Sequence, residues 1–422
     1  MGIEVNRKRI WDVIEQQVHI PQKKAGHLPT NKLKDAWINI LSGGRGFVEV
    51  NTRVKPDQGL QKAFGRRECA EQSTISRCLS VCWAENVKEM RQALEVIIRQ
   101  HSRCYQHDYE KAYQWLDIDM TGIPAGRKAE GSTKGYFSHA AGARGRQVGR
   151  VLASRYNEIV VDQLFPGHVQ LERSLQGLVL AAEAILELDE AKRAQTIIRV
   201  DGGGGRDEDI NWLLERGYLV LVKVKNWQRS KKLLKRVKVW HCDEKDANRR
   251  IGWVEPGHVY ARPTRQIGVE DTHANGDTYR YVLICNPTDE MIYALNQFVP
   301  PIPVQPEHLL SLLLNLYDLR SGGVETSNRN SKSRSRRLAS PWVGSSSITR
   351  RKHSAASAQL PAAAGNDDGV MAAQGGHGAD DIGKHGQIDD DNDQVRRCGE
   401  RVKRVIAFFP EDLPRVGIDG VY

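Results

Sequence analysis

Short apolar segments alternate with longer amphipathic ones in the middle of the chain, and this order constrains the fold more than any other feature. Apolar and acidic residues alternate over 115–120, which predicts a strand that carries Asp117 and Asp119 on one face. Further strands are expected at 159–161, 196–201 and 218–224, with a turn at 165–167 and helical patterns over 170–188 and 207–216. Strands and helices in this order predict an α/β fold.

The segments on either side of this pattern differ from it. Residues 1–108 are mostly helical in pattern, and either a small DNA-binding unit or an ordinary helical subdomain would give the amphipathic stretches at 69–81 and 85–100. The α/β domain would begin with 109–226, continue after a β-rich insertion at 227–302, and be completed by an apolar helix within 303–332. Residues 333–422 are of low complexity and too poor in apolar side chains to offset chain entropy, which predicts a disordered tail.

Charge and cysteine usage narrow the class of protein. The 422 residues include 62 Lys and Arg against 52 Asp and Glu, which gives a net charge of +10 and favours a polyanionic partner, nucleic acid first. No apolar run approaches the roughly 20 residues that a membrane span needs, and the N-terminus has no signal-peptide pattern. Seven irregularly spaced cysteines fit reduced thiols better than a disulfide framework or a zinc site. The expectation is a cytoplasmic protein without a membrane partner.

Three acids stand out by position. Asp119 ends the first expected strand, Asp201 ends a later one, and Glu325 follows the apolar helix. Each acid taken singly is more often a cap or a solvated side chain, but carboxylates at strand ends can converge on one edge of a sheet. Such a cluster suits Mg²⁺ or Mn²⁺, and two ions can serve phosphodiester chemistry. The glycine run 202–205 lacks the ending of a phosphate-binding loop, so a flexible turn and no nucleotide cofactor are expected.

The combination of motifs resembles a known family. Residues 116–122 (Leu-Asp-Ile-Asp-Met-Thr-Gly) and 199–203 (Arg-Val-Asp-Gly-Gly) are similar to the first two acidic blocks of bacterial insertion-sequence transposases of the DDE class. Tyr317, Arg320, Glu325 and Lys332 follow the order of the third block in the cut-and-paste branch, with one extra residue between Arg320 and Glu325. Further similarity lies at 134–137, 145–147 and 211–218, so that the resemblance covers about 60–332.

The resemblance implies a catalytic domain of RNase H-like fold and assigns roles to residues. Asp119, Asp201 and Glu325 would be the catalytic acids and the metal ligands. Asp119 is preferred to Asp117, which stays in reserve, because the family's first acid is closely followed by Thr, here Thr121. The DNA backbone near the cleaved end would be held by Tyr317, Arg320 and Lys332.

A basic segment follows the last apolar strand of the α/β pattern. Residues 223–238 hold eight Lys or Arg and no acid, with Trp227 among them. Cations with interleaved aromatic residues can bind phosphates and stack on bases, whereas an ordinary solvated face would give the same composition. The DNA-binding interpretation assigns this role to Lys223, Lys225, Arg229, Lys231 and Lys232.

The resemblance therefore implies a DNA transposase that cuts and joins DNA at insertion-sequence ends. Its partners would be double-stranded DNA with terminal inverted repeats, target DNA and a second copy of the chain, in a bacterial cytoplasm at the nucleoid. The abrupt change of composition after Glu325 raises the hypothesis of a frameshift or truncation. An inactive remnant that binds DNA ends without cutting them, and a nuclease that cuts without joining, are the alternatives.

Overall fold

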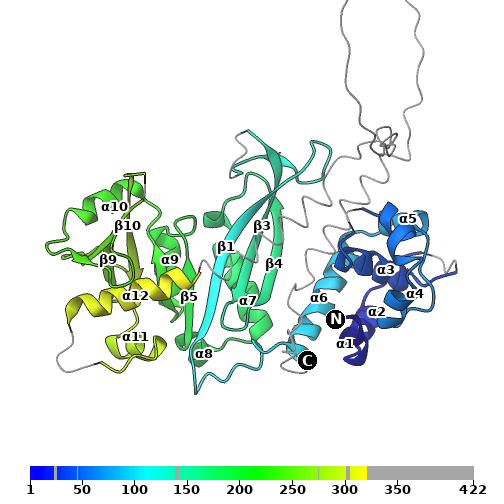
Figure 1. Cartoon of the computed structure of the whole chain (residues 1–422), viewed down its shortest axis with the longest axis horizontal. Helices are drawn as coiled ribbons and strands as arrows, with labels where there is room; N and C mark the ends of the chain where they lie inside the picture. The colour runs from blue at the N-terminus through cyan, green and yellow to red at the C-terminus, as the bar shows by residue number, and fades with distance from the viewer. Residues whose placement is uncertain (23–25, 45, 138–141, 274, 301–304, 321–422) are drawn as a thin grey trace, which may run out of the picture.

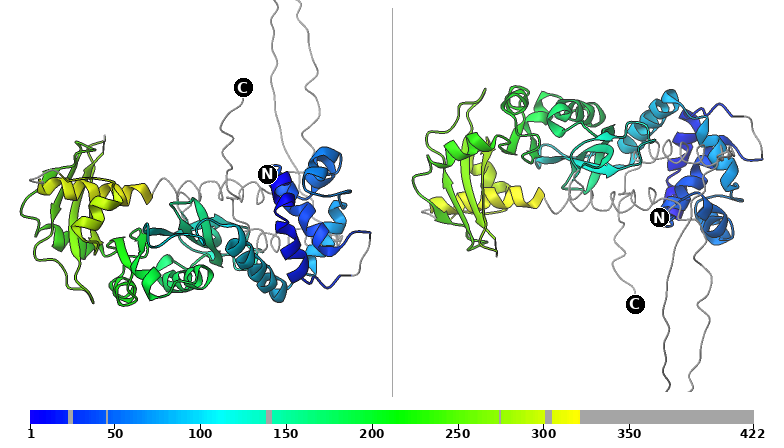
Figure 2. Two further views of the ribbon diagram at one scale, coloured as in Figure 1. Left: turned by 90° about the horizontal axis from the view of Figure 1, so that it is seen from below. Right: turned by 90° about the horizontal axis from the view of Figure 1, so that it is seen from above.

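The computed structural model describes residues 1–22, 26–44, 46–137, 142–273, 275–300 and 305–320. It is a mixed α/β protein in which a large mixed sheet carries helices on both faces and a group of helices precedes it (Figures 1 and 2). The α/β class predicted from the sequence is confirmed. Glu325, Lys332 and the expected disordered tail lie outside the described residues.

The N-terminal helices have a hydrophobic core of their own. Trp11 and Trp37 stack at its centre with ring centroids 5.4 Å apart, and Arg66 forms a buried ion pair with Asp35 at 2.7 Å. Helix α6 leads from this core toward the sheet. The helical elements are α1 (Gly2–Arg7), α2 (Ile10–Gln17), α3 (Pro29–Leu41), the π-helical turn η1 (Val50–Val54), α4 (Gln58–Ala63), α5 (Gln72–Ser80) and α6 (Ala84–His101).

The sheet combines parallel and antiparallel pairing. β1 and β6 flank β5 in parallel, whereas β1 pairs with β3, and β6 with β10, in antiparallel register. The order across the sheet is β2-β3-β1-β5-β6-β10-β9-β8-β7, and β4 also pairs with β3. The strands are β1 (Gln114–Pro124), β2 (Thr133–Lys134), β3 (Arg144–Ala153), β4 (Glu158–Pro166), β5 (Thr196–Val200), β6 (Leu219–Lys223), β7 (His241–Cys242), β8 (Arg249–Trp253), β9 (Arg265–Thr272) and β10 (Thr278–Cys285).

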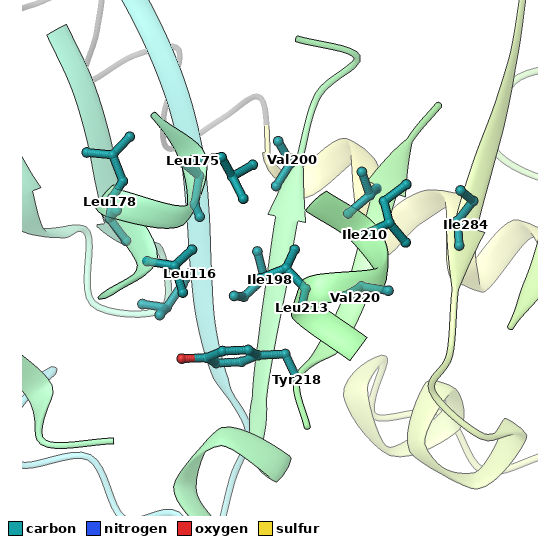
Figure 3. Packing of buried hydrophobic residues seen from close by; sticks show 14 of the residues in the cluster. Leu116, Leu175, Leu178, Ile198, Val200, Ile210, Leu213, Tyr218, Val220 and Ile284 are labelled. Atoms are coloured by element: carbon teal, nitrogen blue, oxygen red, sulfur yellow. The ribbon is translucent and has the colours of Figure 1, made fainter. Parts of the chain in front are cut away.

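Helices cover both faces of this sheet. On one face α7, α9 and α10 bury the apolar side chains of the parallel strands, as Leu175, Leu213 and Ile198 show (Figure 3). On the other face α12 and α11 pack over β6 and β8 to β10, with Leu313 and Leu283 in a second core. The helices are the 3₁₀ turn η2 (Leu171–Arg173), α7 (Leu175–Leu186), α8 (Glu190–Ala194), α9 (Asp207–Glu215), α10 (Trp227–Leu234), α11 (Asp289–Leu295) and α12 (Pro306–Arg320).

The region predicted as a β-rich insertion contributes strands to the same sheet. β7 to β10 fall within 227–302, and β10 joins them to β6 through antiparallel pairing of Leu283 with Lys223. The expected strand at 218–224 is therefore central, as its apolar composition predicted, with β5 on one side and β10 on the other.

Two sequence predictions were wrong in extent, and one strand was not predicted. β1 does not end near Met120 but continues to Pro124, where β3 alone supports it. The turn expected at 165–167 begins only at Gly167, because β4 runs through Pro166. β3 was not predicted as a strand, since its buried positions on both faces include Arg146, Gln147 and Arg150, and so the sequence shows no alternation of apolar and polar residues.

Candidate active site

Asp119 and Asp201 lie on neighbouring parallel strands. β1 pairs with β5 in a register that ends at the residue before each acid, so both follow the last paired position. The Asp119 Oδ1 accepts a hydrogen bond from the Met120 amide, and the Asp201 Oδ1 accepts one from the Gly203 amide, each at 2.8 Å. Both acids are half-buried. Parallel pairing thus brings two acids 82 positions apart to one edge of the β1–β5 pair.

The glycine run after Asp201 forms a turn in which Gly204 and Gly205 are closely packed. A Cβ at Gly205 would lie 1.9 Å from the carbonyl oxygen of Lys223, and the Gly205 carbonyl accepts a hydrogen bond from the Lys225 amide at 3.0 Å. A Cβ at Gly204 would lie 2.7 Å from side-chain atoms of Val200. The absence of side chains therefore lets the turn pack against the end of β6 and fixes the start of α9.

The carboxylate of Asp117, the reserve candidate, forms a buried ion pair with Arg199. Arg199 on β5 donates from Nε and Nη2 to the two Asp117 carboxylate oxygens at 2.6 and 2.8 Å, and both side chains are almost fully buried. Burial raises the pKa of the Asp117 carboxyl, and the charge and hydrogen bonds of Arg199 oppose that rise. Because both carboxylate oxygens are already bonded, Asp117 is poorly suited to bind a cation.

Arg199 also joins this ion pair to helix α12. Its Nη1 donates to the carbonyl oxygen of Leu316 at 2.5 Å, and its Nη2 donates to the Ser154 hydroxyl at 2.9 Å. The guanidinium lies 4.7 Å from the Trp115 ring centroid. One side chain therefore connects β1, β5 and the last turn of α12.

A second buried ion pair lies on the other side of Asp119. Arg150 is directly opposite Asp119 in the β1–β3 register, and it binds Asp162 on β4 through two hydrogen bonds of 2.7 and 2.6 Å. Burial raises the pKa of the Asp162 carboxyl against the effect of Arg150. Asp119 thus lies between two strands that each carry a buried arginine.

Tyr317 and Arg320 lie in the last turn of α12, whose Leu316 carbonyl is bound by Arg199 of the Asp117 ion pair. Arg320 is 8% exposed, and its guanidinium lies 5.6 Å from the Tyr317 ring centroid. Burial acts to lower the pKa of Arg320, but the electrostatic influence of Tyr317, Asp201 and Asp119 outweighs it and the pKa is raised. Burial also raises the pKa of the Tyr317 hydroxyl. Arg320 is therefore a permanent positive charge within the field of both acids.

Lys223 places a second cation at the end of the third parallel strand. Its Nζ donates to the Tyr279 hydroxyl at 2.6 Å and lies 4.4 and 4.5 Å from the ring centroids of Tyr279 and Tyr281. Tyr281 in turn lies 6.5 Å from Tyr317. Of these aromatic side chains Tyr279 is the exposed one, at 48%. Lys223 is one of the DNA contacts predicted from the sequence, whereas the two tyrosines of β10 are not among the predicted site residues.

The other basic candidates divide into paired and exposed residues. Lys225 forms an ion pair with Glu172, and Arg229 forms one with Asp207. Lys231 and Lys232 are exposed on α10, where Trp227 is also exposed, at 60%. Lys225 and Arg229 therefore have local acidic partners that compete with any phosphate, whereas the α10 lysines face solvent.

The described residues include two neighbouring carboxylates but no larger group of potential metal ligands. Among them no group of three or more His, Cys, Asp or Glu side chains could hold a metal ion. Asp119 and Asp201 are two carboxylates on adjacent strands, and oxygen donors of this kind fit a hard divalent cation.

Across the part of the chain that the structure describes, no helix combines the length and the apolar character that crossing a membrane requires.

Comparison with known proteins gives a remote likeness to a solved structure. No family model matches the chain, and no curated protein matches it. Among solved structures, the chain is similar to a piggyBac transposase synaptic complex with hairpin DNA, at 13% sequence identity and a TM-score of 0.39. The match covers 78% of this chain and 74% of that one.

Proposed function

We propose that this chain is a DDE-type DNA transposase whose α/β unit is an RNase H-like catalytic domain. The observation that supports the proposal most is the meeting of Asp119, Asp201 and Arg320. The two acids follow the paired parts of adjacent parallel strands, and the end of α12 places a buried arginine within their field. The resemblance of separate sequence blocks selected these three residues together with Tyr317, Glu325 and Lys332, and the pairing of β1 with β5 supports the choice of the two acids.

The residues present fit a divalent cation and a phosphodiester. Asp119 and Asp201 would hold Mg²⁺ or Mn²⁺, with Glu325 as the third acid, and two such ions activate a water or hydroxyl and stabilise the leaving oxygen. Arg320 would bind a phosphate oxygen, because a buried guanidinium offers rigid, permanently charged donors. Tyr317 would hold the Arg320 guanidinium against its ring.

DNA would extend from this site over the basic surfaces. Lys223 lies at the end of β6, beside Asp201 in strand order, and Lys231 and Lys232 are exposed on α10. These lysines, together with Lys332, would contact phosphates and thereby fix the register of the DNA. Two copies of the chain would each bind one terminal inverted repeat before target DNA is joined.

The test is cleavage and joining of a labelled insertion-sequence end with Mg²⁺ or Mn²⁺. We expect nicking and strand transfer by the wild-type chain, and loss of both in Asp119→Ala and Asp201→Ala. The matched control is Asp277→Ala, which removes an exposed carboxylate from the turn between β9 and β10 and should leave both steps intact.

Three outcomes would contradict the proposal in different ways. Retarded but uncut DNA for every protein would indicate the binding remnant. Nicking without joined products would indicate a nuclease. Equal activity of the wild type and Asp201→Ala would place the chemistry elsewhere in the chain.

A further inference from the structure

Thr121 is a buried polar residue close to the two acids that no part of the proposed function uses. It lies two residues after Asp119 on β1, and alternation along the strand places Asp117, Asp119 and Thr121 on one face. Two residues of strand span about 7 Å. Thr121 is 3% exposed, and its hydroxyl oxygen has no hydrogen-bond partner.

A buried hydroxyl without a partner is unfavourable and needs an explanation. Such a group loses its hydrogen bonds to water without replacing them, so most buried hydroxyls in folded proteins are bonded. Thr196 on the neighbouring strand shows the usual arrangement, because it is fully buried and donates to the Lys192 carbonyl at 2.8 Å. A valine would have the shape of Thr121 without the polar atom, and so packing alone does not account for a threonine there.

Arg320 also has buried polar atoms without a hydrogen-bond partner. Its Nε and Nη1 are buried and have no hydrogen-bond partner, although the side chain lies in the electrostatic field of Asp119 and Asp201. Both residues are donors: a guanidinium has no acceptor, and a hydroxyl can donate one hydrogen bond. None of these three atoms is hydrogen-bonded to the nearby carboxylates, and an oxyanion bound between β1 and the end of α12 would supply them with an acceptor.

We propose that Thr121 and Arg320 together form a phosphate-binding site, in which the Thr121 hydroxyl donates to a non-bridging oxygen of the phosphodiester. This inference rests on the proposed function for the identity of the substrate. The carboxylates of Asp119 and Asp201 repel a phosphate, so the site binds it only together with a divalent cation. Thr121 would then contact the phosphodiester that is cleaved rather than other phosphates along the DNA.

Thr121→Val is the isosteric test, because it removes the donor and keeps the volume. We expect cleavage of the labelled DNA end to be about 10- to 100-fold slower, the effect of a lost hydrogen bond to a charged group. The melting temperature should be unchanged or higher, since an unpaired hydroxyl is replaced by a methyl group. Thr121→Ser keeps the donor and should restore most of the rate.

Thr196→Val is the matched control for a hydroxyl with a purely structural bond. It should lower Tm by about 2–4 °C and leave the rate per folded molecule unchanged. A Thr121→Val variant that loses rate only in proportion to lost folded protein would overturn the inference.

A binding measurement separates this inference from the proposed function. Thymidine 5′-monophosphate with Ca²⁺ should raise the Tm of the wild type and of Thr121→Ser, but not that of Thr121→Val. A wild type that binds the nucleotide yet never cuts DNA would contradict the transposase proposal and leave the phosphate site standing. An equal shift in the wild type and Thr121→Val, or no shift in the wild type, would refute the phosphate site.

Discussion

Replacing Arg199 should be among the most damaging single changes in the α/β unit. Arg199→Ala removes the guanidinium that binds both carboxylate oxygens of Asp117, the Leu316 carbonyl and the Ser154 hydroxyl. Asp117 is fully buried, so the variant leaves a carboxylate without a counter-charge in the interior. Removing one partner of such a pair costs about 3–5 kcal/mol. That is a large fraction of the roughly 5–15 kcal/mol by which a typical protein is stable.

The measurement is urea unfolding followed by far-ultraviolet circular dichroism, with a surface pair as control. Arg280 binds Glu270 at 2.7 Å, but the Arg280 side chain is 47% exposed. Arg280→Ala should therefore cost only about 0.2–1 kcal/mol, as measured for exposed pairs. Both variants remove a guanidinium from a carboxylate, but Glu270 keeps Arg250 as a partner, whereas Asp117 stays buried without a counter-charge, so Arg199→Ala should cost much more.

A double variant tests the reasoning more directly. Asp117→Leu combined with Arg199→Met leaves no buried charge, so it should be more stable than Arg199→Ala although it changes one more residue. The argument would be refuted if Arg199→Ala cost less than about 1 kcal/mol, or if the double variant were less stable than Arg199→Ala.

Three further predictions concern backbone packing, pH and salt. Gly205→Ala would place a Cβ 1.9 Å from a backbone oxygen of β6 and should cost about 1–3 kcal/mol in urea unfolding, whereas Gly177→Ala, with open space in α7, should be neutral or stabilising. Burial lowers the pKa of His107 below its usual 6.5, so its contribution to stability is complete above that pH and is lost as the pH falls through the lowered pKa. His107→Gln should remove that part of the pH dependence in thermal unfolding between pH 7.5 and 5. Lys231→Ala with Lys232→Ala should reduce the slope of log K against log salt for DNA binding by about 2, and an unchanged slope would exclude both from phosphate contact.

The sequence was sufficient to predict the helices and strands whose apolar side chains recur with a simple period. β5 and β6 are buried apolar segments bounded by glycine and polar residues, and α7, α9 and α12 have apolar faces of helical spacing. The alternation around Asp119 predicted the correct face of β1 for both Asp117 and Asp119. Neighbouring strands of this kind pair in parallel, so the meeting of Asp119 and Asp201 could be predicted as well.

What could not be predicted depends on partners far apart in the chain. β3 carries Arg146 and Arg150 at buried positions, and a local pattern gives no sign that Asp162 on β4 will neutralise Arg150. Likewise nothing near Arg199 shows that it will bind Asp117, 82 positions earlier, and Leu316, 117 positions later. The exclusion of Asp117 as a candidate followed only when these contacts were known.

The buried ion pairs around the acids fix the relative positions of strands and helices more than they add to the free energy of unfolding. Apolar replacements of a buried pair are often neutral or stabilising, so stability alone does not account for Asp117–Arg199 and Arg150–Asp162. Both pairs have the two-bond geometry that fixes a side chain in orientation as well as in distance. One pair ties β1 to β5 and, through the Leu316 carbonyl, to α12, and the other ties β3 to β4 opposite Asp119. The site proposed at Asp119, Asp201 and Arg320 would need those elements in a fixed relation, because electrostatic catalysis depends on groups that are in place before reaction.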